Sequence, residues 1–119
     1  SNLLKVKGWN IKLGNQNIWE LDFFSLDSFI NLNDIKLQPS KLSGTGEIYL
    51  GSNLEIEKLS LSGNYEVTVS KDLSILVKGQ ATVPNQWLDA SVGKLNYPDK
   101  TYTVIIEIID GSQVIFKDG

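Results

Sequence analysis

The stretch from Thr101 to Lys117, TYTVIIEIIDGSQVIFK, constrains the fold of this chain more than any other part of the sequence. Two runs rich in β-branched residues flank Asp110-Gly111, and this dipeptide between such runs is a strong signal for a β-hairpin with a type I′ turn. A two-residue loop of this kind would place Glu107 opposite Val114 in an antiparallel pair. The first run is apolar on both faces, so it is expected to be a central strand that is covered on both sides.

Alternating apolar and polar residues predict two further hairpins. In the first, the turn lies at residues 14–17, and three apolar pairs face each other: Leu13 with Trp19, Ile11 with Leu21, and Trp9 with Phe23. Aromatic and aliphatic cross-strand pairs each stabilise a sheet by about 0.2–1 kcal/mol, so this hairpin would have one wholly apolar face. In the second hairpin, the strand from Leu73 to Val77 lies opposite the strand from Tyr65 to Val69.

The rest of the chain reads as short strands separated by turns at intervals of about ten residues, which is typical of an antiparallel sandwich or barrel. The segment from Phe24 to Leu32 is ambiguous between a short helical turn and a strand. We favour a short turn or loop there, followed by a strand over Phe29 to Leu37 that is interrupted at Asn33-Asp34. We therefore predict a single all-β domain over residues 1–119, an antiparallel β-sandwich with little or no helix; the alternative is a partly closed β-barrel. The expected core residues are Trp9, Ile11, Leu13, Trp19, Leu21, Phe23, Ile48, Val67, Ile75, Val77, Val104, Ile106 and Ile108.

The amino-acid composition excludes many kinds of active site. The 119 residues include no Cys, His, Met or Arg, and all 11 basic residues are Lys. Without His and Cys the chain lacks the usual ligands of zinc, copper, haem and iron–sulfur clusters, and it lacks His- and Cys-based catalysis. The net charge of −3, with no basic run, argues against nucleic acid as a partner. We therefore predict a protein that is not an enzyme and binds no cofactor.

The acidic and amide side chains fit structural roles better than chemical ones. Glu55 and Glu57 lie two positions apart, as do Glu20 and Asp22, and carboxylates on the same face of one strand do not face each other across a cleft. The oxygen-rich clusters that could hold Ca²⁺ are Asn31 with Asn33 and Asp34, and Asn96 with Asp99. Neither cluster has the EF-hand spacing, and Asn and Asp are common in turns, so no metal site is predicted.

Aromatic side chains supply the candidate ligand site. Trp9 and Trp19 fall on the apolar face of the first predicted hairpin and are expected in the core. Trp87 and Tyr97 both fall in predicted loops, where binding residues are frequent. Because the C–H faces of sugars dock on exposed aromatic rings, an exposed pair of Trp87 and Tyr97 is the ligand-binding site that the sequence predicts.

The alternating strands, punctuated by Gly and Asn, are similar over the whole chain to β-rich domains of bacterial envelope, secretion and adhesion proteins and of virion tails and fibres. The likeness lies in the general pattern, includes no diagnostic motif and implies no functional residue. Together with the missing catalytic residue types, it favours a non-catalytic structural or protein-interaction domain that binds a protein partner or self-assembles through an edge strand. The alternative is a carbohydrate- or lipid-binding β-sandwich module.

The location and origin of the chain are also expectations at this point. The sequence starts at Ser1 without an initiator Met, which favours a domain excised from a larger protein or a processed form. It shows no signal peptide and no apolar run of about 18 residues, so no transmembrane segment is predicted. We expect the parent assembly to be extracytoplasmic (periplasmic, cell-surface or secreted) or part of a virion.

Overall fold

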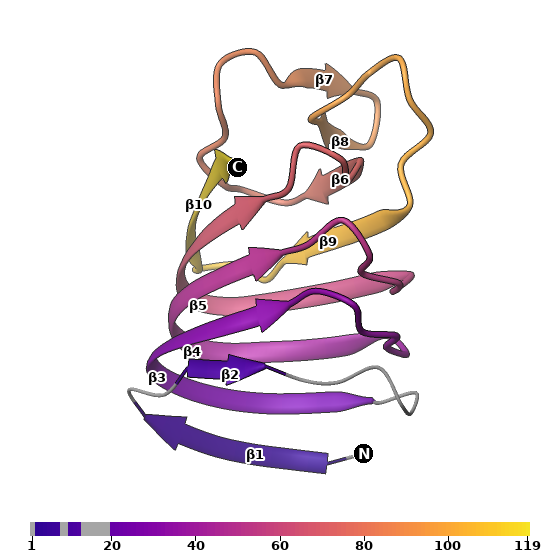
Figure 1. Cartoon of the computed structure of the whole chain (residues 1–119). Coiled ribbons are helices and arrows are strands. Elements are labelled where there is room, and N and C mark those ends of the chain that lie inside the picture. The colour runs from indigo at the N-terminus through magenta and orange to yellow at the C-terminus, as the bar shows by residue number, and fades with distance from the viewer. Residues whose placement is uncertain (1, 8–9, 13–19) are drawn as a thin grey trace.

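The structure is a computed structural model that describes the backbone of residues 2–7, 10–12 and 20–119 and the side chains of residues 20–119. In this part of the chain, ten strands form one mixed sheet and no residue is helical (Figure 1). The strands are β1 (Asn2–Lys7), β2 (Asn10–Lys12), β3 (Leu21–Leu32), β4 (Ser40–Leu50), β5 (Lys58–Val69), β6 (Ile75–Lys78), β7 (Leu88–Ala90), β8 (Gly93–Leu95), β9 (Val104–Ile108) and β10 (Gln113–Asp118). Among the described residues, no helix is long and apolar enough to cross a lipid bilayer.

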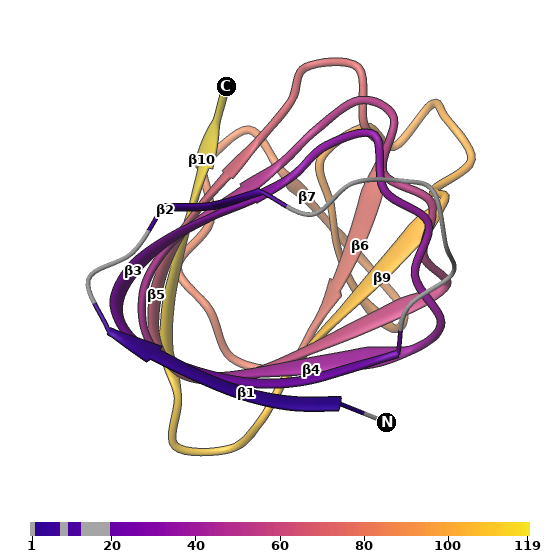
Figure 2. The same cartoon turned by 60° about the horizontal axis from the view of Figure 1, so that its bottom comes forward.

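The strands stack in parallel, and the chain winds as a β-solenoid (Figure 1). Phe23 pairs with Leu42 and Leu42 pairs with Leu61, nineteen positions later each time. The strands β3, β4 and β5 are therefore three successive coils, and β1 and β2 pair with the other edge of β3. Each long strand bends near its middle, so that its two halves lie on different sides of the interior, as the view in Figure 2 shows.

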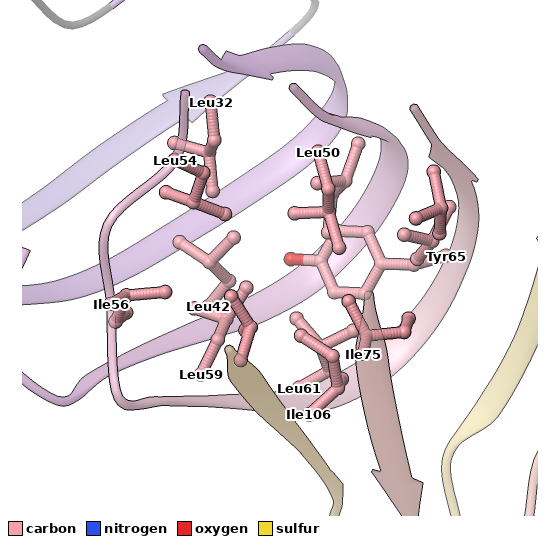
Figure 3. Close-up of a cluster of buried hydrophobic side chains, with 14 of the residues drawn as sticks. Leu32, Leu42, Leu50, Leu54, Ile56, Leu59, Leu61, Tyr65, Ile75 and Ile106 are labelled. Atoms are coloured by element: carbon pink, nitrogen blue, oxygen red, sulfur yellow. The ribbon is translucent and has the colours of Figure 1, made fainter. Parts of the chain in front are cut away.

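The interior is filled by aliphatic side chains from successive coils, because every second residue of a strand points to the same face. Leu32 pairs with Leu50 and Leu42 pairs with Leu61, and Figure 3 shows these four side chains converging in one cluster. All four are fully buried. Since burial of such a side chain is worth about 1.5–3 kcal/mol, these stacked rows are the main favourable contribution to the stability of the solenoid.

Most of the predicted core residues are in this cluster. Nine of them are buried: Leu21, Phe23, Ile48, Val67, Ile75, Val77, Val104, Ile106 and Ile108. Trp9, Leu13 and Trp19 lie outside the described residues, as does the side chain of Ile11. The prediction is therefore confirmed wherever the structure describes the side chain.

Tyr65 is the one aromatic residue with a hydroxyl in the core cluster. Its ring projects inward among leucine and isoleucine side chains (Figure 3), and its Oη lies 3.3 Å from Ser25 Oγ. Burial raises the pKa of the Tyr65 hydroxyl above its ordinary value, and the hydrogen bond with Ser25 partly offsets that rise. The hydroxyl is thus held neutral inside the solenoid with one buried partner.

Glycines form the bends of the coils that contain β4 and β5. Gly44 and Gly63 are register partners on β4 and β5, and they have φ values of 114° and 126°, which favour glycine over other residues. A Cβ atom on Gly44 would lie 1.8 Å from the carbonyl oxygen of Ser25 in the preceding coil, and one on Gly63 would lie 1.9 Å from the carbonyl oxygen of Gly44. The sharp bend and the close stacking of coils therefore both depend on the missing side chain.

The segment from Phe24 to Leu32 belongs to β3, so the turn or loop favoured before Phe29 is wrong, and the strand ends at Leu32 and does not reach Leu37. The register with β4 shifts between Ser25 and Ser28, which marks a β-bulge, and Asp27 in that bulge has a φ of 52°. Its backbone N–H donates a hydrogen bond to Thr45 Oγ1 at 3.0 Å. The extra residue changes the parity of inward side chains, which explains why the alternation of a strand is broken here.

The C-terminal strands occupy an unexpected place in the stack. β9 lies between β5 and β6, and β10 pairs with the second half of β5 (Figure 1). The turn at Asp110-Gly111 is present, because Ser112 N donates to Ile109 O at 3.1 Å. Of its two central residues only Gly111 has positive φ, at 87°, so the turn is of type II and the two strands do not fold back on each other. The predicted hairpin, with Glu107 opposite Val114, is therefore wrong.

The antiparallel part of the sheet lies at one end of the solenoid. β8 pairs with β6 and β7 pairs with β8, both in antiparallel fashion. Asn96, directly after β8, is buried and joins this end to the coil below it. Its Nδ2 donates to the carbonyl oxygen of Leu73 at 2.8 Å, and its Oδ1 accepts from the N–H of Ile75 at 2.8 Å. The side chain thus pairs two buried backbone groups at the start of β6.

Replacing Asn96 with alanine is expected to lower the free energy of unfolding by about 2–4 kcal/mol, because each buried backbone group left without a partner costs roughly 1–3 kcal/mol. The Asn85→Ala variant is the matched control, since Asn85 is an exposed loop residue. Urea denaturation followed by circular dichroism measures both. Equal stability of the two variants would show that Asn96 does not hold this end of the sheet.

The prediction of an all-β chain is confirmed, but the predicted antiparallel pairing is wrong for most of the sheet. β3, β4, β5, β9 and β6 follow one another in parallel, and the antiparallel pairs are those among β6, β8 and β7. The described strands form one sheet wound into a solenoid, and the structure confirms neither the sandwich nor the barrel. A solenoid also explains why alternating segments recur about every ten residues in the sequence, because each half of a coil contributes one short segment of strand.

The other two predicted hairpins are corrected in the same way. Ile11 pairs in parallel with Ile30, and Leu21 pairs with Asn2, so the N-terminal hairpin is wrong where the structure describes it. The other two predicted pairs of that hairpin, Leu13 with Trp19 and Trp9 with Phe23, each include a residue that lies outside the described part of the chain. The strand from Ile75 pairs with β9 and β8 and has no register with β5, so the predicted pairing of residues 73–77 with residues 65–69 is wrong as well.

Candidate functional site

A groove of about 840 Å³ is formed by the turns that connect the coils. Residues 34–35, 52–57, 72–74, 100, 101 and 103 line it. The first three segments are equivalent turns of successive coils, which stack at one side of the molecule (on the right in Figure 1). The groove is thus a product of the solenoid, since it arises from the stacking of turns that lie far apart in the sequence.

Asparagine and aspartate side chains hold these turns against each other. Asp34 has a φ of 53°, a conformation that Asn and Asp adopt more readily than other residues with a side chain. Asn53, in the turn of the next coil, donates from Nδ2 to Asp34 Oδ1 at 2.6 Å and from its backbone N–H to Asn33 Oδ1 at 3.4 Å. Asn33 and Asp34, two of the calcium ligands considered from the sequence, thus bind the neighbouring turn.

The groove has an acidic rim and an apolar floor. Four exposed carboxylates line it, from Asp34, Glu55, Glu57 and Asp72, against the single ammonium group of Lys100. Its buried lining residues are Ile35, Leu54, Ile56, Leu73 and Ser74. A surface of this kind suits an extended segment that carries positive charges and alternate apolar side chains.

Ser74 adds a polar group to the lining. It is 7% exposed, and its Oγ has no hydrogen-bond partner among the described residues. Its backbone carbonyl oxygen accepts from the N–H of Thr103 at 3.0 Å, which fixes the residue between the turn before β6 and the segment that leads into β9. Buried hydroxyl groups usually have a partner, so the unpaired Ser74 hydroxyl is unusual, but the oxygen itself is covered and is not exposed in the groove.

The carboxylates of the described residues are not arranged as a metal centre. No group of three or more acidic side chains in this part of the chain converges as metal ligands would. Asn96, another candidate from the sequence, uses its side chain to pair backbone groups at the start of β6. The acidic rim is therefore a charged surface and offers no candidate metal site.

Trp87, the first predicted ligand-binding residue, lies in the core. It is 4% exposed, its ring packs against Phe116 at a centroid distance of 5.6 Å, and its Nε1 donates to Asp118 Oδ1 at 3.0 Å. Gln86 donates to the other carboxylate oxygen of Asp118 at 2.5 Å. The ring therefore has no exposed face, and its position gives no support to a role in ligand binding, which stays a prediction.

Tyr97, the second predicted residue, is half-buried and has a different environment. The ammonium group of Lys100 lies 4.7 Å from the centre of the Tyr97 ring, and Lys100 N donates to Tyr97 O at 3.2 Å. Cation–π contacts at such exposed sites are worth about 0.5–1 kcal/mol. Trp87 and Tyr97 thus have separate partners, and it is Tyr97, through Lys100, that adjoins the groove.

The groove could not be predicted from the sequence, because the groove forms only when the turns of successive coils stack. Of its acidic residues, the sequence indicates Glu55 and Glu57 only as a pair on one face of a strand, and Asp34 only as part of a turn cluster. The available signal was the nineteen-residue spacing of equivalent positions, such as the buried turn residues Ile35, Leu54 and Leu73. Comparison with protein-family models, with curated proteins and with solved structures finds no match to this chain.

Proposed function

We propose that this chain is a non-catalytic protein-interaction domain of a larger extracytoplasmic or virion assembly, and that it binds an extended, lysine-rich segment of a partner protein. The observation that carries the proposal is the groove of stacked turns, with four carboxylates on its rim and aliphatic residues in its floor. An extended segment with alternating side chains would present charges to the rim and apolar groups to the floor.

The proposal of a non-catalytic role rests on the composition of the chain. The sequence offers only carboxylates, Lys, Tyr, Ser and Thr for chemistry. In the groove the carboxylates lie on an exposed rim, whereas acid–base catalysis depends on a group whose environment shifts its pKa toward the working pH. The assignment to an extracytoplasmic or virion assembly is supported by the general sequence pattern described above.

We expect a fluorescent ten-residue peptide of alternating Lys and Val to bind at low salt, and the same peptide with Glu in place of Lys to remain unbound. The double variant Glu55→Gln/Glu57→Gln is expected to weaken binding by about five- to tenfold, because each exposed charge pair contributes roughly 0.2–1 kcal/mol. Fluorescence anisotropy measures the affinity. Raising the salt concentration should weaken binding further, since exposed charges are screened.

The matched control is Asp22→Asn/Glu47→Gln, which removes the same two charges from exposed positions outside the groove. This variant should change the affinity by less than about twofold, since neither residue lines the groove or contacts a peptide bound there. Equal losses in both double variants would mean that the peptide binds through net charge alone. That result, or no binding by the Lys peptide, would count against the groove as a protein-binding site.

A further inference from the structure

In the parallel part of the described sheet, the order of strands in space differs from their order in the chain at β9. β9 pairs with Lys58–Leu61 of β5 on one side and with Ile75–Lys78, the whole of β6, on the other. β10 pairs with the second half of β5, and Thr82 bridges to Ile115 on its other side. The last segment of the chain is therefore inserted between two segments that precede it, as Figure 1 shows. We call this position the slot; β5 bounds it on one side, and β6 with Thr82 on the other.

The slot holds its occupant by backbone hydrogen bonds to both walls. On the β5 side, Ile105 N donates to Glu57 O at 3.0 Å. On the opposite side, Phe116 N donates to Thr82 O at 2.8 Å, and Thr82 N donates to Val114 O at 2.9 Å. Without an occupant, the edges of β5 and β6 would both be unpaired, because β6 has no register with β5. The slot is thus a complementary site for a parallel strand segment.

Apolar burial adds to this complementarity. The inserted segment buries five side chains: Val104, Ile106, Ile108, Val114 and Phe116. Trp87 packs on Phe116 from outside the slot and holds Asp118 by its indole N–H. The groups that bind β9 and β10 therefore all belong to residues 57–87, a part of the chain that is complete before the inserted segment begins.

The connection into the slot is a polar segment, residues 96–103, between β8 and β9. Residues 98–103 are exposed, and the segment contains a turn in which Lys100 N donates to Tyr97 O at 3.2 Å. Fully extended, eight residues span roughly 25–30 Å, whereas β8 and β9 lie two strand spacings, about 10 Å, apart across β6. The connection is thus long enough to lead into the slot of another molecule.

We propose that β9 and β10 exchange between two copies of this chain, each copy inserting residues 104–118 into the slot of the other. The occupant is a second copy because the exchanged segment makes the same hydrogen bonds and apolar contacts as in the monomer, and only the connection changes its path. The slot is formed by earlier residues and filled by the last ones, so a neighbouring copy competes for it during folding. This inference concerns self-assembly and does not depend on the proposed peptide groove.

Introduced thiols can test the exchange cleanly, because the chain has no Cys. Ser60 on β5 and Glu107 on β9 are register partners, and neither is fully buried. A tagged Ser60→Cys variant and an untagged Glu107→Cys variant are mixed, unfolded in urea, refolded together at high concentration and oxidised. Exchange brings the two thiols of different copies within disulfide reach, so a disulfide-linked mixed dimer is expected.

The control pair is Ser60→Cys with Asp22→Cys. Asp22 pairs with Lys41, which pairs with Ser60, so these thiols lie two strands apart in every arrangement of β9 and would link only by random collision. The first pair should give at least about fivefold more mixed dimer than the control, because disulfide formation needs Cα atoms within roughly 7 Å. Equal yields from the two pairs would overturn the proposal.

A second measurement needs no thiol. Refolding the unaltered chain at increasing concentration should raise the dimer fraction severalfold, because insertion into a second copy is bimolecular whereas insertion within one molecule is not. Size-exclusion chromatography with light scattering measures this fraction after refolding. A chain that folds and stays monomeric at every refolding concentration would overturn the exchange, whatever the reason for a failure of the peptide to bind the groove.

Discussion

The Gly44→Ala variant is expected to lose more than about 4 kcal/mol of unfolding free energy, a large part of the roughly 5–15 kcal/mol that is typical of a folded domain. Gly44 has a φ of 114°, and a Cβ atom there would lie 1.8 Å from the carbonyl oxygen of Ser25. That oxygen belongs to the backbone of the preceding coil, so it cannot move away without breaking the parallel ladder between β3 and β4. The strain of the backbone and the steric overlap therefore add.

Gly111→Ala is the matched control, because it separates these two effects. Gly111 also has positive φ, at 87°, but a Cβ atom there would have no neighbour within 4 Å. The Gly111→Ala variant should lose about 1–2 kcal/mol of unfolding free energy, the cost of placing a residue with a side chain in a left-handed conformation. Urea denaturation followed by circular dichroism compares the two. Equal stability of Gly44→Ala and Gly111→Ala would contradict the conclusion that the coils approach too closely at Gly44 to admit a side chain.

The burial of side chains could be predicted from the sequence, because alternation with a period of two assigns residues to faces without reference to the partner strand. Phe23, Val67 and Ile106 are buried as that pattern predicts. The direction of pairing could not be obtained in the same way, since parallel and antiparallel neighbours satisfy the same alternation. The N-terminal hairpin was inferred from matched apolar rows, and stacked coils match equally well.

A weak repeat contained the missing information. Leu42-Ser43-Gly44 and Leu61-Ser62-Gly63 are identical triplets nineteen positions apart, and they are register partners on β4 and β5. The bulge at residues 25–28 removes the same regularity from the preceding coil, because it shifts the spacing of paired residues by one position. Two clear copies and one altered copy are difficult to distinguish from the general similarity of β-strands.

The place of the C-terminal strands depends on one backbone angle and on distant parts of the chain. Asp110-Gly111 marks a turn correctly, but a hairpin requires positive φ at Asp110 as well, and that residue has negative φ. The surroundings of Trp87 in the predicted ligand-binding site also depend on distant parts of the chain. Trp87 was placed in a loop, which is where it lies, yet the loop passes over β10 and the ring is covered by Phe116.

The Trp87→Ala variant is expected to lose about 3–5 kcal/mol of unfolding free energy, as is usual when a large buried aromatic side chain is truncated. It removes the packing of the indole on Phe116 and the hydrogen bond from Nε1 to Asp118. Trp87→Phe keeps an aromatic ring at the same place and should lose only about 1–2 kcal/mol, chiefly from that hydrogen bond. Leu88→Ala is the control, because Leu88 is the next residue and is 52% exposed.

This series also decides how a loss of ligand binding at Trp87 must be interpreted. If Trp87→Ala loses several kcal/mol while Leu88→Ala loses less than about 0.5 kcal/mol, a missing response in the alanine variant reflects unfolding, and only the folded Trp87→Phe variant tests binding. Thermal and urea unfolding of all three variants provide the comparison. If Trp87→Ala were as stable as Leu88→Ala, the ring would not be part of the core. An exposed aromatic platform with Tyr97 would then become the better account of this end of the molecule.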